Sequence, residues 1–146
     1  TNDDRSGHGN LLDADLYYSL PGSKVQIFGG GGYESNSADL RNYSYGEYKA
    51  RAGVRFFLPW QLQVGLTGKL NRKVYDEVDT FFGIRRKDTK WEAACSLSRP
   101  IYQEWLRLVA DYRFTRSDSN IKESATGVET FDYERHQATL SVAMNF

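Results

Sequence analysis

Charged side chains recur at every second position along several segments of the chain, and this spacing places them on one face of an extended strand. Such a face could line the interior of a barrel, where an excess of basic groups would favour anionic solutes or anionic polymer segments. The alternative is a network in which basic and acidic groups neutralise one another and hold a narrow interior shut. The residues predicted to line this interior are Lys49, Arg51, Arg55, Lys69, Lys73, Arg107, Asp111 and Arg113.

Side chains with carboxylate or amide oxygens in two expected loops are candidate calcium ligands. Asp76, Glu77 and Asp79 lie in one loop, and Asp118 and Asn120 lie in another. Oxygen ligands suit calcium, but the spacing of these residues matches no defined calcium-binding loop. Solvated loop charge is therefore the simpler interpretation, and no metal site is predicted.

No pattern of residues indicates an enzyme. His8 and His136 are far apart in the sequence and lack the spacing of metal ligands. The single cysteine, Cys95, excludes an intrachain disulfide, and no basic partner is near it in the sequence to activate the thiol. No nucleophile is singled out by its neighbours. We therefore predict neither catalytic activity nor a cofactor.

Four consecutive glycines, residues 29–32, interrupt one of the alternating segments. They do not form a phosphate loop, because no Lys-Ser or Lys-Thr pair and no helix follow them. Glycine inside a strand permits a bend or a close approach of another backbone. The run therefore indicates either a bend in the barrel wall or a groove against a plug or passenger segment.

Seven segments that alternate between apolar and polar residues must position the charged side chains. Most are longer than the five or six residues at which soluble strands centre, and crossing a membrane takes roughly 9 to 11 tilted residues. The pattern predicts an all-β fold, an antiparallel up-and-down transmembrane β-barrel with about seven or eight visible strands. The segments are residues 11–20, 24–34, 47–58, 61–71, 91–98, 106–115 and 134–146.

The last segment carries an apolar stripe that ends on an aromatic carboxyl terminus. Leu140, Val142, Met144 and Phe146 fall on one face of this strand. The stripe resembles the closing strand of bacterial outer-membrane barrels, whose assembly machinery reads such a signature. The resemblance implies the bacterial outer membrane as the location, with its lipid and the barrel assembly machinery as partners.

The links between the segments alternate in length. Residues 21–22, 59–60 and 99–103 read as tight turns, whereas residues 35–43, 76–86 and 117–130 read as long polar loops. Outer-membrane barrels place short turns on the periplasmic side and long loops outside. Counting back from Phe146, the first strand descends from the outside, so residues 1–10 are expected to be an extracellular loop.

The odd number of segments raises the question of closure. Single-chain bacterial barrels have an even number of strands, and an unpaired edge in lipid would leave backbone groups without hydrogen bonds. We therefore expect residues 1–146 to be the C-terminal part of a larger barrel, or to pair with another chain. The alternative is that residues 1–146 form one complete eight-stranded barrel domain.

The overall charge and the aromatic residues agree with a membrane location. The 19 basic and 19 acidic residues cancel, so no global field directs the chain to nucleic acid. Aromatic residues are abundant, with 10 Tyr, 8 Phe and 3 Trp, and many lie near the ends of the predicted strands. This distribution is typical of the aromatic girdles at the two membrane interfaces.

Several short stretches resemble the C-terminal barrel of the surface lipoprotein assembly modifier family and related outer-membrane proteins with tetratricopeptide repeats. The resemblance covers roughly residues 44–146, and its most specific pieces are Arg-Ser-Asp-Ser-Asn-Ile and Asp-Tyr-Glu-Arg. It implies a barrel of about fourteen strands that follows a periplasmic helical-repeat domain. This chain carries no such repeats. The stretches are residues 53–60, 82–88, 97–100, 111–121 and 131–135.

Three functions are compatible with these observations. The first is transport or secretion across the outer membrane, through a pore or by surface export of a protein, a lipoprotein or an anionic solute. The second is a structural or adhesion barrel whose extracellular loops bind a partner, with residues 117–130 as the main candidate loop. The third, a barrel enzyme, has the least support.

Overall fold

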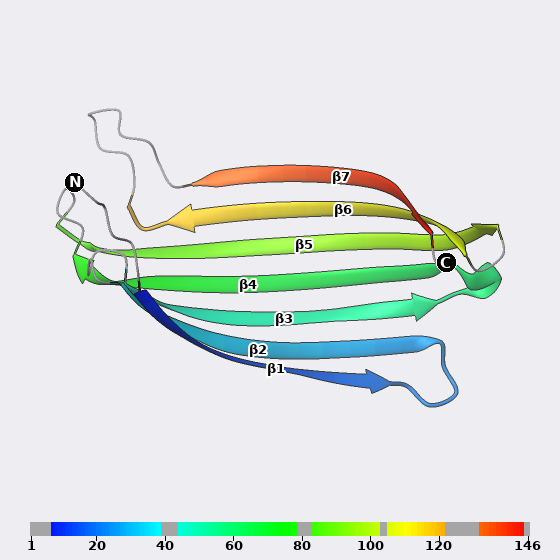
Figure 1. The fold of residues 1–146 in the computed structure, drawn as a ribbon, viewed down its shortest axis with the longest axis horizontal. Helices are drawn as coiled ribbons and strands as arrows, with labels where there is room; N and C mark the ends of the chain where they lie inside the picture. The colour runs from blue at the N-terminus through cyan, green and yellow to red at the C-terminus, as the bar shows by residue number, and fades with distance from the viewer. Residues whose placement is uncertain (1–6, 39–43, 79–82, 103–104, 122–131, 145–146) are drawn as a thin grey trace.

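A single antiparallel sheet contains, in sequence order, the seven strands of the described part of the chain. In the computed structural model each strand pairs with the next one along the chain, so the topology is up-and-down (Figure 1). The structure describes residues 7–38, 44–78, 83–102, 105–121 and 132–144. The strands are β1 (Gly7–Ser19), β2 (Val25–Ala38), β3 (Tyr45–Phe57), β4 (Gln63–Val78), β5 (Arg85–Tyr102), β6 (Leu106–Ser119) and β7 (Tyr133–Met144).

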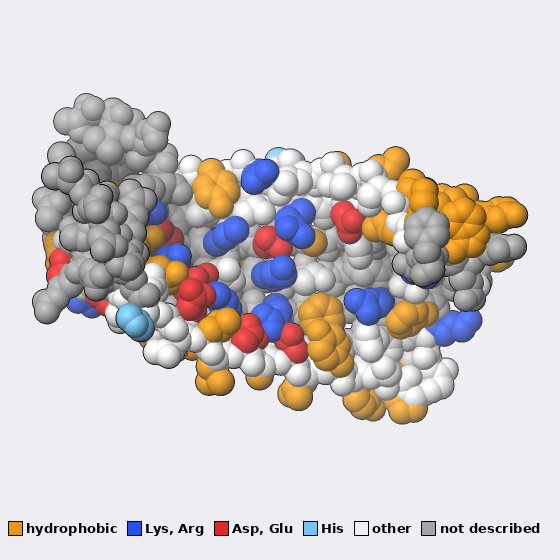
Figure 2. All heavy atoms as spheres, viewed as in Figure 1, with side chains coloured by type: hydrophobic (Ala, Val, Ile, Leu, Met, Phe, Trp, Pro, Cys, Tyr) orange, Lys and Arg blue, Asp and Glu red, His pale blue; other side chains and the backbone are white. Residues whose placement is uncertain are grey.

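The two faces of this sheet differ in chemistry and in exposure. Along β5 the exposed positions include Trp91, Cys95 and Leu97, whereas Glu92 and Ser96 between them are half-buried. The apolar face is thus the more exposed one, and the charged face is hollowed, with Lys, Arg, Asp and Glu side chains across its middle (Figure 2). A soluble sheet normally buries its apolar face and exposes its polar one.

Almost no apolar side chain of the described residues is fully buried. Ile121, which follows β6, is the one buried hydrophobic residue among them, with 2% of its surface exposed. The fold is therefore held by the hydrogen-bonded ladders between long strands and by interactions across the charged face. None of the described residues forms a helix long and apolar enough to cross a membrane.

The prediction of seven antiparallel strands is confirmed, but several boundaries were wrong. Residues 7–10, expected to be loop, belong to β1, and residues 99–102, expected to be part of a turn, belong to β5. Strand β2 also continues to Ala38, and β6 continues to Ser119. The backbone ladders extend beyond the apolar stripe from which the boundaries were predicted, because strand pairing does not require an apolar side chain.

The sheet does not close on itself within the described residues. Strands β1 and β7 are its two edges and do not pair with each other. The seven strands therefore form an open curved wall (Figure 1) rather than the complete eight-stranded barrel that was the alternative expectation.

The turn between β1 and β2 confirms the tight link predicted at Pro21 and Gly22. The amide of Leu20 donates to the carbonyl of Val25 at 3.0 Å, and the amide of Ser23 donates back to the carbonyl of Leu20 at 3.1 Å. Gly22 has a φ of 70°, as the third position of a type II turn requires. Proline before it sets the preceding φ, so the two residues together specify this turn.

The substitution Gly22→Ala should lower the free energy of unfolding by about 1–2 kcal/mol, because an L side chain is disfavoured at this positive φ. Gly68→Ala is the matched control. Its Cβ would meet no atom within 4 Å, and its backbone is not left-handed. Chemical unfolding in detergent micelles measures both variants, and equal stabilities would contradict the assignment of this turn.

Candidate functional site

The candidate site is the charged, hollow face of the sheet, called here the concave face. The strand register places all eight residues that were predicted to line an interior on this one face. They come from β3, β4 and β6, and β1, β2 and β5 add their own polar side chains between and beside them. The eight are Lys49, Arg51, Arg55, Lys69, Lys73, Arg107, Asp111 and Arg113.

Arg51 forms the most connected group on this face. Its Nε donates to Asp15 Oδ1 at 2.6 Å, and its Nη2 donates to Asp15 Oδ2 at 2.7 Å. Its Nη1 donates to Asp13 Oδ2 at 3.0 Å, and Nη2 also contacts Asp13 Oδ1. One guanidinium on β3 therefore binds two carboxylates on β1 in the fork geometry that suits arginine. This group is called the Arg51 clamp below.

The clamp spans a whole strand, because β2 lies between β1 and β3. Gly30 stands directly between Asp15 and Arg51 in the register, and Gly32 stands between Asp13 and Lys49. A Cβ at Gly30 would lie 1.8 Å from Asp15 Oδ1 and 2.5 Å from the carbonyl oxygen of Ala14. Glycine at these positions leaves the space in which the ions meet.

This geometry gives the glycine run a role that neither interpretation included. The pairing of β2 with β1 and with β3 continues through residues 29–32 with no shift of register, so the run makes neither a bulge nor a break in the ladder. The two glycines on the concave face instead remove side chains from the path between Arg51 and its carboxylates. The clamp occupies the space above Gly30. The bend in the barrel wall and the groove for a passenger segment stay predictions.

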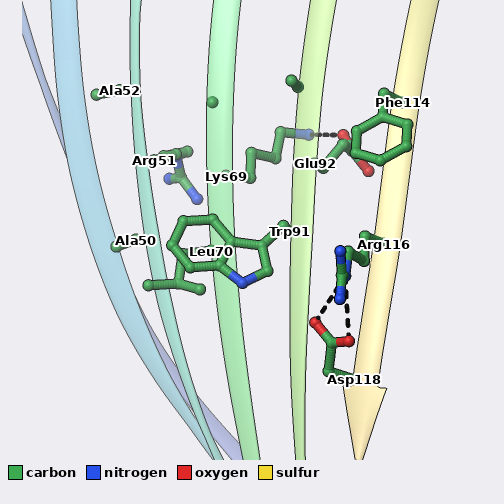
Figure 3. Close-up of a pocket in the computed structure, with 12 residues that line it drawn as sticks. Ala50, Arg51, Ala52, Lys69, Leu70, Trp91, Glu92, Phe114, Arg116 and Asp118 are labelled. Atoms are coloured by element: carbon green, nitrogen blue, oxygen red, sulfur yellow. Dashed lines mark hydrogen bonds and ion pairs between the residues drawn. The ribbon is translucent and has the colours of Figure 1, made fainter. Parts of the chain in front are cut away.

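A second cluster lies in the middle of the concave face around Glu92. Lys69 stands opposite Glu92 in the register, and its Nζ lies 3.2 Å from Glu92 Oε1 (Figure 3). Arg113 Nε lies 3.6 Å from the same oxygen. This oxygen is buried and has no hydrogen bond of good geometry among the described residues, so the two cations alone compensate its charge.

Toward the ends of β2 and β3 that lead into the long loops, the basic residues are also paired. Lys49 Nζ lies 2.5 Å from Glu34 Oε2, and the hydroxyl of Tyr45 donates to Glu34 Oε1 at 3.1 Å. Lys73 Nζ lies 3.9 Å from Glu47 Oε2. The network interpretation therefore describes this half of the face better than a free basic lining does.

At the end of the sheet with the short turns, the arginines of the concave face meet only neutral groups. Arg55 Nη1 donates to Gln26 Oε1 at 3.4 Å, and Arg107 Nη1 donates to Ser98 Oγ at 3.3 Å. Among the described residues neither arginine forms an ion pair. The turn end of the concave face therefore carries two arginines whose charge no described carboxylate balances.

Sequence reasoning missed several members of the concave face. Glu34 was not among the predicted interior charges, and Asp88 and Lys90 fell outside the predicted segments altogether. Continuing the alternation of β5 backwards past Trp91 would have placed Lys90 and Asp88 on the same face as Glu92.

The residues predicted as an assembly signal lie on the opposite, apolar face. Leu140, Val142 and Met144 are exposed there, with Leu140 at 71%. Phe146 lies outside the described residues.

The remaining candidates for chemistry are engaged elsewhere or lie far from the concave face. Asp118 pairs with Arg116 on the apolar face, as Figure 3 also shows, and the Asn120 side chain caps the backbone of β5. His136 bonds to the hydroxyl of Tyr112 at 2.8 Å. Cys95 is exposed on the apolar face.

Among the described residues no group of three or more potential ligands could hold a metal ion. Asp79 lies outside the described residues.

Comparison with known proteins gives one match. A family model described as "Surface lipoprotein assembly modifier" matches residues 1–146. The match extends the resemblance noted from residues 44–146 to the first two strands as well. No curated protein and no solved structure shows significant similarity to the chain.

The substitution Gly30→Ala should lower the free energy of unfolding by about 1–3 kcal/mol, because the added methyl group collides with Asp15 and with a backbone carbonyl. Gly29→Ala is the matched control on the neighbouring residue. Its Cβ would meet the carbonyl oxygen of Arg51 at 3.8 Å, an ordinary contact. Unfolding by denaturant in micelles compares the two, and a Gly30 variant as stable as the control would show that the clamp needs no cleared path.

Proposed function

The chain belongs to the surface lipoprotein assembly modifier family, and from that membership we propose that it forms part of a transmembrane β-barrel in the bacterial outer membrane. In this proposal the barrel acts in the export and surface assembly of lipoproteins. The apolar face contacts lipid, and the concave face lines the interior through which polar material passes.

The observation that carries the proposal is the inverted exposure of the sheet. Leu12, Leu16 and Leu140 expose 75%, 82% and 71% of their surface, whereas the carboxylates of Asp15 and Glu92 are largely shielded, at 25% and 13%. In water this arrangement would leave a large apolar surface uncovered on a chain with almost no buried core. In lipid the same apolar face is solvated, and the polar face turns to the interior.

The positions of aromatic residues support a membrane crossing of the usual length. Trp91 lies near one end of the apolar stripe on β5, where its neighbours in the register are Leu70 and Arg116. Tyr102 ends β5 at the other side. The interval between the two corresponds to the roughly 9 to 11 residues that cross a bilayer. Both side chains are more than half exposed, as girdle residues are.

The open edges of the sheet require partners in the membrane. Strand β1 and strand β7 each present one unpaired row of backbone groups, which lipid cannot hydrogen-bond. We therefore propose that further strands, from the same protein or from another chain, complete the barrel. The barrel assembly machinery would insert it, with Leu140, Val142 and Met144 as part of the signal on β7.

The concave face supports passage better than catalysis. Its charges bind one another across the strands, as the Arg51 clamp does, which leaves no activated nucleophile among the described side chains. We propose a role that is not enzymatic. Placing the short turns in the periplasm puts Arg55 and Arg107, two arginines that form no ion pair among the described residues, at the entrance for an exported chain.

The membrane-facing assignment predicts opposite results for two neighbouring arginine substitutions on β5. Cys95→Arg puts a charge on the apolar face and should destabilise the inserted protein by about 2–4 kcal/mol. Ser96→Arg puts the same charge on the concave face, opposite Asp111, and should be tolerated. Folding into lipid vesicles, followed by chemical unfolding, measures both. Equal losses of stability in the two variants would contradict the assignment of one face to lipid and the other to the interior.

The export role predicts a loss of surface lipoprotein when the gene is deleted. Antibody labelling of intact cells should detect less lipoprotein outside, while the total amount of lipoprotein in the cells stays the same. Ser96→Arg protein should restore labelling, and Cys95→Arg protein, if it fails to insert, should not. Undiminished surface labelling in the deletion strain would contradict the export role and leave the membrane assignment untouched.

A further inference from the structure

A small polar hollow lies on the concave face at the end nearest the long loops. Its volume is about 240 Å³, and four adjacent strands, β3 to β6, contribute to it. We propose that this hollow binds an oxyanion, a phosphate or carboxylate group carried by a molecule about the size of one sugar ring. This goes beyond the export role and does not depend on it. The hollow is lined by Glu47, Asn71, Lys73, Tyr75, Asp88, Lys90 and Ser117.

The positive charge for an anion comes from Lys90. Its side chain is half-buried, and among the described residues it forms no hydrogen bond and no ion pair. The other lysines of the concave face on β3 and β4, namely Lys49, Lys69 and Lys73, all have a carboxylate within 4 Å. A partly desolvated ammonium group without a counter-charge is unfavourable, and an anion in the hollow would compensate it.

The neutral groups around Lys90 also have hydrogen-bonding capacity left. The side-chain amide of Asn71 and the hydroxyls of Tyr75 and Ser117 have no hydrogen-bond partner among the described residues. Asn71 and Ser117 flank Lys90 directly in the register, one on β4 and one on β6. An amide N–H, two hydroxyls and an ammonium group can all donate to the oxygens of one anion.

The two carboxylates of the hollow are each paired with a cation, so their repulsion of a bound anion is reduced. Asp88 lies 2.7 Å from Arg86 Nη2 and accepts from Arg86 Nε as well. Glu47 lies 3.9 Å from Lys73 Nζ. When these two ion pairs are counted as neutral, the hollow keeps the single positive charge of Lys90. The carboxylates can still accept hydrogen bonds from hydroxyl groups, as a sugar ring would offer.

The rim of the hollow is held by contacts between aromatic rings and cationic groups. The rings of Tyr45 and Tyr75 lie 6.0 Å apart, with Lys73 Nζ 3.8 Å from the centre of the Tyr45 ring. The guanidinium of Arg86 lies 4.9 Å from the centre of the Tyr75 ring. These contacts order the rim before any ligand binds, which lowers the entropy cost of binding.

Size and location set this hollow apart from the larger ones on the same chain. Pockets for drug-sized ligands measure roughly 300–1,000 Å³, so 240 Å³ limits the ligand to a smaller molecule. The larger hollows, of about 760 and 620 Å³, lie on the apolar face over Ala52, Gly68 and Ala93 (Figure 3). Membrane lipid would fill those.

The test is calorimetric titration of the full-length protein in detergent micelles. The probes are inorganic phosphate, glucose 6-phosphate, glucuronate and uncharged glucose. We expect the anions to bind and glucose to bind at least about tenfold more weakly, since a hydrogen bond to a charged group is worth more than a neutral one. The tighter of the phosphate and carboxylate sugars identifies the preferred anion. Failure of every anion to bind would overturn the proposal.

Matched variants on β5 locate the binding. Lys90→Met should weaken anion binding at least about tenfold. Lys87→Met, at an exposed lysine on the opposite face of the same strand, should leave it unchanged. If Lys90→Met does not fold, Asn71→Leu provides the second variant and should also weaken binding. Equal affinities in the hollow variants and in the Lys87 variant would overturn the assignment to this hollow.

Discussion

The whole structure depends on one constraint, that the sheet exposes its apolar side and must therefore place its charges together on the other. Alternation along each strand sends every second side chain to the concave face, where seven strands gather acidic and basic groups at close range. Unpaired, these charges would repel or remain poorly solvated. The pattern of ion pairs across β1 to β6 is the consequence, and it takes the place of the apolar core that the described residues lack.

The Arg51 clamp shows how the backbone adapts to this constraint. Side chains on adjacent strands are close enough to interact directly. A strand two positions away in the sheet lies beyond the reach of most side chains. Arginine is long enough to reach it if nothing stands between. Glycine at residues 30 and 32 meets that condition, at the expense of side-chain packing and of β-propensity in the middle of β2. The composition of one strand is thus explained by the charges on its two neighbours.

The sequence was enough to predict which side chains of each strand share a face. It was not enough to predict which side chains of other strands they contact. The period of two identified the seven strands and placed on one face all eight residues that were predicted to line an interior. It could not show that Gly30 stands between Asp15 and Arg51, because that depends on the register of three strands.

Pro100 misled the prediction in another way. It was read as the end of a strand, but it lies inside β5 just before a shift of register, where a missing N–H is tolerated.

The uneven pairing along the concave face fits the export role in physical terms. An interior with strong unpaired charges throughout would hold a passing polypeptide, because each favourable contact must be broken again before the chain can leave. Pairing the middle of the wall through Glu92 and the Arg51 clamp removes such traps from the path. Among the described residues, Arg55 and Arg107 toward the turn end and Lys90 toward the loop end have no ionic partner. Asp111 on β6 and Arg135 on the edge strand β7 also lack one. On the proposed orientation, Arg55 and Arg107 attract anionic groups to the periplasmic entrance, and Lys90 meets them nearer the exit.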